Sequence, residues 1–284
     1  MNRVFRNALF LLFSVLLLAG CGKKTEPANA TMKQAEEETA VQEPSPAASP
    51  DEYFIWYENA IIGLTEQGQV AQTLVIPSKC DRLADSLLLD SSVREVLFDG
   101  NKIESLEMTF TDSKNLERII LPEKIKEIGE YCFAGCSSLE AVSIPASVSI
   151  IGNYAFMGCT SLSELTFKGG QIKEIPEGAF MMCRSLAAAD IPEGVSEIRE
   201  SAFRDCSSLR EISLPSTIKS IGNMAFATTD LDKVYFHKNA RPNPVTLLTF
   251  GSTTYKVHFY IEEGSWMDRN RDQWYQEIGS IEYR

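Results

Sequence analysis

The 284-residue sequence contains only two histidines and fewer basic than acidic residues, with 27 Lys and Arg against 39 Asp and Glu. Its formal net charge is −12. This deficit excludes a nucleic-acid binder that works through bulk positive charge, because such proteins neutralise phosphates with clustered Lys and Arg. Scarce histidine also narrows the catalytic and metal-binding options, since histidine is the commonest residue in both roles. Hydrophobic residues make up 44%, which is enough for a folded core.

The sequence also lacks the motifs that are typical of common active sites. It has no G-x-S-x-G nucleophile turn, no Walker loop and no dinucleotide fingerprint. His237 and His258 stand among aromatic and strand-like residues near the C-terminus, and we interpret both as surface or packing residues. We therefore expect no catalytic residues, no cofactor and no metal. A hydrolase stays the third hypothesis, because a site assembled across distant segments leaves no local motif.

No apolar run reaches the roughly 20 residues needed to span a bilayer. The longest, Ala8–Gly20, has 13 residues and follows Arg3 and Arg6, which is the form of a secretory signal. Because small residues precede Cys21, the segment resembles a bacterial lipoprotein signal. The resemblance implies that residues 1–20 are removed and that Cys21 carries lipid. It also implies a cell-envelope location, in the outer membrane, facing the surface or the periplasm. The alternative is a plain signal peptide with an incidental cysteine.

Residues 21–50 have no aromatic side chain, several prolines and the acidic run Glu36-Glu37-Glu38. Such a composition cannot bury enough apolar surface to offset the entropy of ordering. We predict a flexible tether between the lipidated cysteine and a folded part that begins at Asp51. We interpret the acidic run as solvating charge rather than as a partner site.

A repeat organises residues 71–260. Its consensus is L-x-x-I-x-I-P-x-x-V-x-x-I-G-x-x-A-F-x-x-C-x-x, and successive copies begin 22–24 residues apart. One phenylalanine recurs in each copy and forms the most regular column. These residues are Phe110, Phe133, Phe156, Phe180, Phe203, Phe226 and Phe250.

The consensus predicts a stacked, mainly β solenoid. The alternation in L-x-x-I-x-I is typical of a short strand, and the proline that follows ends it. No single coil can bury its apolar face, so coils must stack with equivalent residues one above another. We expect about eight coils, with the phenylalanines forming a buried structural spine.

This pattern resembles the BspA-like, or Treponema-type, leucine-rich repeats of bacterial surface proteins, including those of gut Bacteroidetes. The resemblance covers about two thirds of the chain. It implies a right-handed solenoid with a parallel β-sheet on one face, and a non-catalytic role in recognition or adhesion. We also expect two caps, because the terminal coils of a solenoid must be shielded. Residues 51–70 form an N-terminal hairpin, and residues 261–284 include a short helix that begins after the N-cap Ser265 and runs to about Ile278.

Six cysteines remain after Cys21, and four occupy one repeat position: Cys136, Cys159, Cys183 and Cys206. Other coils place Ser113, Thr229 and Thr253 there. The position therefore favours a small residue that packs inward and makes one hydrogen bond. We predict buried free thiols, with disulfides as the alternative, because stacked parallel Cβ vectors suit bridging poorly.

One exposed column of the predicted sheet is a candidate ligand-binding surface. The first three coils present aliphatic side chains, Val75, Leu97 and Ile120, and later coils present mostly polar ones. With the nearby charges this could be an apolar stripe with a charged rim. The alternatives are plain β-propensity and cover by the N-terminal segment. We expect a monomer tethered to the membrane, whose partner is a host or bacterial surface protein or glycan. The main alternative is a periplasmic scaffold without an external ligand.

Overall fold

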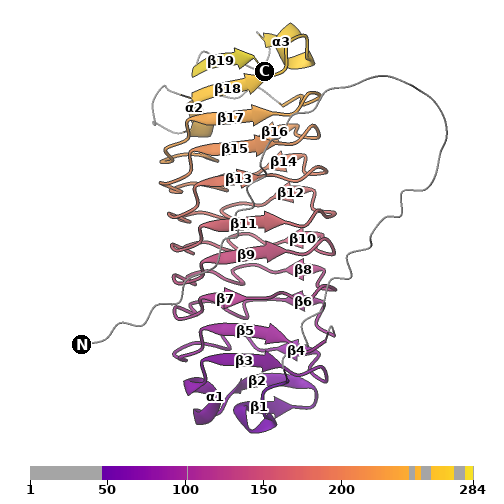
Figure 1. Cartoon of the computed structure of the whole chain (residues 1–284), viewed down its shortest axis with the longest axis vertical. Coiled ribbons are helices and arrows are strands. Elements are labelled where there is room, and N and C mark those ends of the chain that lie inside the picture. The colour runs from indigo at the N-terminus through magenta and orange to yellow at the C-terminus, as the bar shows by residue number, and fades with distance from the viewer. Residues whose placement is uncertain (1–46, 101, 243–246, 251–256, 272–278, 284) are drawn as a thin grey trace, which may run out of the picture. The chain divides into compact units, whose positions relative to one another are not determined.

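The computed structural model describes residues 47–100, 102–242, 247–250, 257–271 and 279–283. Within these residues the chain forms about nine coils of a parallel-sheet solenoid, so the predicted fold class is confirmed. Figure 1 shows the long strands stacked one above another, with short strands on the neighbouring side of each coil. Cys21 and the proposed signal lie outside the described residues. Among the described residues, no helix has the length and hydropathy of a membrane span.

The long strands come from the L-x-x-I-x-I part of the repeat and form two five-stranded sheets. The first contains β3 (Thr73–Ile76), β5 (Glu95–Phe98), β7 (Arg118–Ile119), β9 (Ala141–Ile144) and β11 (Glu164–Phe167). The second contains β13 (Ala188–Asp190), β15 (Glu211–Leu214), β17 (Lys233–Phe236), β18 (Val257–Ile261) and β19 (Gly279–Tyr283). All pairs are parallel and in register, as Val75 opposite Leu97 illustrates.

The two sheets are not paired with each other. The break between β11 and β13 opens a hollow of about 420 Å³ beside the longer coil that begins at Leu162.

Short two-residue strands follow the long strand of each coil and pair in two further parallel sheets. They are β6 (Ser105–Leu106), β8 (Glu127–Ile128), β10 (Ile150–Ile151), β12 (Glu174–Ile175), β14 (Glu197–Ile198) and β16 (Ser220–Ile221). The glycine that follows this segment, such as Gly152, does not have the left-handed backbone of the turn. The left-handed backbone lies two residues later, for example at Tyr154, with φ of 57°. Gly152 instead allows close approach, because a Cβ there would lie 2.3 Å from the Glu130 nitrogen of the preceding coil.

The seven spine phenylalanines form one continuous stack. Each side chain is 0–5% exposed, and adjacent ring centroids lie 5.1–5.9 Å apart. Backbone hydrogen bonds join the coils at the same corner; the Phe133 N–H, for example, donates to the Ala155 carbonyl at 2.7 Å. Because each ring packs between two others, the stack joins all the central coils into one core.

An antiparallel hairpin of β1 (Phe54–Tyr57) and β2 (Ala60–Leu64) lies at the N-terminal end, between η1 (Asp51–Tyr53) and α1 (Glu66–Val70). β2 pairs with β4 (Arg82–Leu83), so the hairpin continues the short-strand side of the first coil. The fold begins earlier than Asp51. The Ser49 N–H donates to the Val75 carbonyl at 3.0 Å, and the Ser49 hydroxyl accepts from the Val75 N–H at 2.9 Å. The end of the predicted tether therefore lies along the outer edge of β3.

The C-terminal end contains α2 (Leu247–Phe250), α3 (Trp266–Arg269) and the strand β19, which lies beyond the predicted repeats. Ser265 is the N-cap of α3, as predicted, and its hydroxyl accepts from the Asp268 N–H at 3.2 Å. The helix does not run unbroken to Ile278. It ends at Arg269, where the Asn270 amide and backbone N–H both donate to the Trp266 carbonyl. Trp266 packs against the core; residues 272–278 are outside the described residues.

Candidate binding surface

The sequence analysis predicted that a ligand binds to the outer face of the long-strand sheets. In-register pairing turns each strand position into a column of side chains that crosses the coils. Glu95 therefore lies beside Arg118, and Ser213 lies beside Tyr235. Because every second residue of a strand points outward, the face presents these columns to solvent at fixed spacing.

The three predicted ligand-binding residues differ in exposure. Ile120 is 49% exposed and Leu97 is half-buried, but Val75 is only 6% exposed. The expectation that Val75 faces solvent is wrong, because the segment that contains Ser49 hydrogen-bonds along its strand. Cover by the N-terminal segment had been one of the alternatives. The apolar stripe is therefore reduced to Leu97 and Ile120.

Charged side chains flank these two residues, and they are paired rather than free. Arg118 donates to Glu95 at 2.7 Å, and Arg94 donates to Glu117 at 2.7 Å, each pair joining neighbouring coils. These pairs are largely exposed and add little stability. Both pairs lie on the N-terminal side of Leu97 and Ile120, so a partner would meet an apolar centre bordered on that side by satisfied charges.

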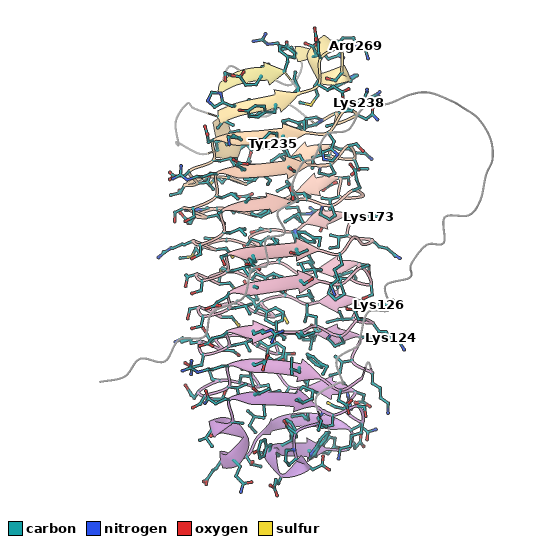
Figure 2. All side chains as sticks on the ribbon, viewed as in Figure 1. Lys124, Lys126, Lys173, Tyr235, Lys238 and Arg269 are labelled. Atoms are coloured by element: carbon teal, nitrogen blue, oxygen red, sulfur yellow. The ribbon has the colours of Figure 1, made fainter. Side chains whose placement is uncertain are left out.

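The other end of the face is aromatic and polar. The rings of Tyr235 and Tyr260 stack with centroids 4.7 Å apart on β17 and β18. Lys233 forms an ion pair with Glu211, and the hydrogen bond that its ammonium group donates to that carboxylate raises the Lys233 pKa. Figure 2 shows Tyr235 on the long-strand side of the solenoid. Tyr260 was not part of the predicted column, although its strand pattern matches that of Tyr235.

A serine, a histidine and two carboxylates meet on the same face across β17, β18 and β19. The Ser280 Oγ lies 2.6 Å from the Nδ1 of His258, and Glu282 lies 3.4 Å from the same nitrogen. On the other side of the ring, Nε2 is 3.8 Å from the Asp232 carboxylate. The His258 side chain is 40% exposed. This group has the residue types of a nucleophile triad, but Ser280 also hydrogen-bonds Glu282 and the group lies on an open sheet face. These contacts connect β18 to β19 and to Asp232, which directly precedes β17.

His237 lies elsewhere, half exposed, with Nδ1 3.2 Å from the Glu193 carboxylate. Burial alone would raise the Glu193 pKa, but hydrogen bonds from Ser216 and His237 lower it. Among the described residues, no group of three or more His, Cys, Asp or Glu side chains is arranged to hold a metal ion.

All six cysteines of the described part are buried and free. At the repeat position, each thiol donates to the phenylalanine carbonyl of the preceding coil, at 3.0–3.2 Å. Thr229 instead bonds the carbonyl of its own coil, while the buried Ser113 hydroxyl has no partner among the described residues, unlike the predicted pattern. Thr253 is outside the described residues. Burial raises the pKa of Cys206 to about 12 and that of Cys183 well above its ordinary value.

We expect these thiols to resist alkylation in the native protein. The thiolate is the reactive form, so a pKa near 12 slows labelling at pH 8 by on the order of a thousandfold relative to an unperturbed thiol. Iodoacetamide labelling followed by mass spectrometry, with and without denaturant, measures this ratio. The denatured, unreduced protein should show six labelled cysteines besides Cys21. A smaller number would reveal disulfides, and equal rates in both conditions would mean that the thiols are accessible.

Comparison with known proteins matches this architecture. The family profile described as "BspA type Leucine rich repeat region" matches residues 67–168 and 126–243, with six copies. No protein of curated function matches the chain.

Solved structures of leucine-rich repeat proteins are similar, among them one from Bacteroides ovatus and one from T. pallidum. A leucine-rich repeat protein from Bacteroides ovatus is 19% identical with a TM-score of 0.57; the match covers 78% of this chain and 55% of that one. This chain thus spans about half the length of that relative, and the likeness concerns the fold. The T. pallidum leucine-rich repeat protein TpLRR is 27% identical with a TM-score of 0.48, covering 67% and 86% of the two chains. The profile match spans more than half of the sequence, and the chain therefore belongs to the BspA-type leucine-rich repeat family.

Proposed function

We propose that this chain is a non-catalytic cell-envelope lipoprotein, anchored through Cys21, that recognises a protein or glycan through the outer face of its long-strand sheets. The observation that carries the proposal is the exposed Ile120, with Leu97 beside it, next to two ion pairs that join neighbouring coils. Leucine-rich repeat folds are scaffolds of the protein-binding type, which supports a recognition role. A structural lipoprotein without an external ligand is the alternative.

A non-catalytic role is favoured over hydrolysis by the setting of the Ser280 cluster. A serine hydrolase needs preorganised N–H donors at the developing oxyanion and a site that excludes water. The His258 ring is 40% exposed, and the carboxylate on its Nε2 side is 3.8 Å away, beyond ordinary hydrogen-bond length. We therefore assign these residues to strand pairing at the end of the sheet.

The apolar centre is tested by the double variant Leu97→Ser/Ile120→Ser. Removing buried contact at a well-packed interface should lower the amount of ligand captured from mucosal or bacterial extracts about tenfold. The full-length chain is immobilised, and bound material is quantified against wild type. Ile150→Ser is the matched control, because Ile150 is 51% exposed on the short-strand side. Equal capture by the double variant and the control would remove the sheet face as the binding surface.

The envelope role is tested by protease accessibility on intact cells. An anchored protein that faces outward is degraded when protease is added to whole cells, whereas a periplasmic scaffold is degraded only after the outer membrane is permeabilised. Complete protection on intact cells would reject the adhesion hypothesis and favour the scaffold alternative. Release of the Cys21→Ser variant into the medium or periplasm would support the lipid anchor, and retention of that variant in the membrane would contradict it.

A further inference from the structure

A column of cations follows the short-strand side of this otherwise acidic protein. Lys126, Lys173 and Lys219 each directly precede a short strand, and Arg241 occupies the same place in the next coil. All four side chains are exposed. We call these four residues the basic column. Figure 2 shows Lys126 and Lys173 on the same side of the solenoid, beside the short strands.

The three lysines of the basic column have no ion-pair partner among the described residues, whereas many other cations of that part of the chain have one. Arg94, Arg118 and Lys233, for example, all pair with a carboxylate of a neighbouring coil. Arg241 lies 5.8 Å from the Trp266 ring. Unpaired cations at regular spacing make a surface that attracts anions without first breaking internal contacts.

Nearby carboxylates leave the column positive. The acidic side chains beside it are Glu127, Glu174 and Glu197, and the exposed Glu104 occupies the same position in the coil before Lys126. Arg199 contacts two of them, with nitrogen–oxygen distances of 2.6 Å to Glu174 and 3.4 Å to Glu197, and its single positive charge offsets one. Around Lys173, Lys219 and Arg241 this leaves one carboxylate charge against three cations, so the field along this part of the column favours an anionic ligand.

The spacing of the column suits an extended chain with widely separated charges. Serines occupy the intervening coils, at Ser149 and Ser196. Since coils stack about 4.8 Å apart where they pair as strands, the lysines lie about 10 Å from one another. This is roughly the length of an extended disaccharide. In a glycan with one acidic group per disaccharide, successive acidic groups would therefore each lie beside one lysine of the column.

A polar hollow beside the column supplies hydrogen-bonding groups. Its volume is about 360 Å³, and its lining includes Lys173, Lys219 and Arg241 together with Ser196, Thr217 and Asn239. The Thr217 hydroxyl donates to the Val195 carbonyl at 2.7 Å and accepts from the Gly194 N–H at 3.0 Å. Hydroxyl and amide groups fixed beside cations suit a ligand that carries both hydroxyl and acidic groups.

From this arrangement we propose that the basic column and its hollow bind a linear acidic polysaccharide that carries carboxylate or sulfate groups. This goes beyond the sheet-face function, because it uses the short-strand side of each coil. A peptide strand could not add here through its backbone, since the chain at the column already pairs between coils. Ser196 N–H, for example, donates to the Lys173 carbonyl at 2.8 Å, and Lys219 N–H donates to the Ser196 carbonyl at 2.8 Å. The lining offers no aromatic ring on which a nucleic-acid base could stack.

The experiment measures the affinity of the full-length chain, in mild detergent, for polygalacturonate and for dextran sulfate, with uncharged dextran as the reference. We expect binding to at least one acidic glycan, and the two probes distinguish carboxylate from sulfate as the preferred charge. Affinity should fall as salt is added. Failure to bind either acidic glycan, or equally tight binding of uncharged dextran, overturns the proposal. So does equally tight binding of polyglutamate or of an oligothymidylate.

The variant Lys173→Ser/Lys219→Ser tests the site itself. Serine already occupies this position in two coils, so the fold should accept it, and thermal unfolding followed by circular dichroism checks this. Losing two charge-assisted contacts should weaken acidic-glycan binding about tenfold or more. The matched control is Lys114→Ser/Arg184→Ser, which removes the same charge from exposed residues in the turns that follow the spine corner. Equal loss in both variants, or no loss in the first, overturns the assignment.

Discussion

Replacing Phe156 by alanine should lower the free energy of unfolding by about 3–5 kcal/mol. Phe156 is fully buried, and its ring stacks on Phe133 at 5.1 Å and on Phe180 at 5.3 Å. Alanine would leave a cavity between two rings that the coil-to-coil backbone hydrogen bonds hold apart, so the site cannot collapse to fill it. Urea unfolding followed by circular dichroism measures the change.

Two companion variants make the Phe156 result interpretable. Phe156→Leu keeps most of the side-chain volume and should lose less stability than alanine. Tyr57→Ala removes an aromatic ring that is 63% exposed on the hairpin, and it should change stability by less than about 0.5 kcal/mol. If Phe156→Ala lowered the free energy of unfolding no more than Tyr57→Ala does, the phenylalanine stack would not stabilise the fold. In that case the description of these residues as a structural spine would be wrong.

Replacing Gly152 by alanine should cost about 2–3 kcal/mol, although only one methyl group is added. The new Cβ would lie 2.3 Å from the Glu130 nitrogen and 2.5 Å from the Gly129 carbonyl carbon. Both atoms belong to the backbone of the preceding coil and cannot rotate away as the end of a side chain would. The coils would have to separate at this corner, which also strains the neighbouring stack. Thermal and urea unfolding of the full-length chain measure the loss.

Gly63→Ala is the control for the Gly152 substitution. A Cβ at Gly63 would meet Ile55 Cδ1 at 3.4 Å, which is ordinary van der Waals contact. We expect this variant to be neutral or stabilised by up to about 1 kcal/mol, because alanine restricts the unfolded chain. A neutral Gly152→Ala would show that the coils tolerate a wider spacing than the structure has.

The repeat itself could be predicted because equivalent residues recur in the sequence every 22–24 positions. Equivalent residues stack, so the column that includes Phe133 and Phe156 indicated both the coil length and the position of the core. The cysteine position followed from the same register. Ser265 could be recognised as a cap because its pairing with Asp268 is local.

The features that sequence reasoning missed depend on contacts between distant segments. Val75 has the pattern of an exposed strand residue, and only the return of Ser49 along that strand buries it. The close approach at Gly152 could not be predicted, because a sequence shows the absence of a side chain but not the neighbour that requires it. β19 was also missed, although the alternation of Ser280, Ile281 and Glu282 is typical of a strand and was a usable signal.

The two hydrogen bonds between Ser49 and Val75 also determine where a mechanical load would enter the fold. A pull on the N-terminal segment reaches the first coil through Ser49, and passes to the hairpin before it reaches any spine phenylalanine. Coils of a solenoid contact only their neighbours, so they would detach in order from this end while the central stack stayed intact. A tethered copy would therefore yield first at its attachment point, with the later coils, the basic column and most of the sheet face still folded.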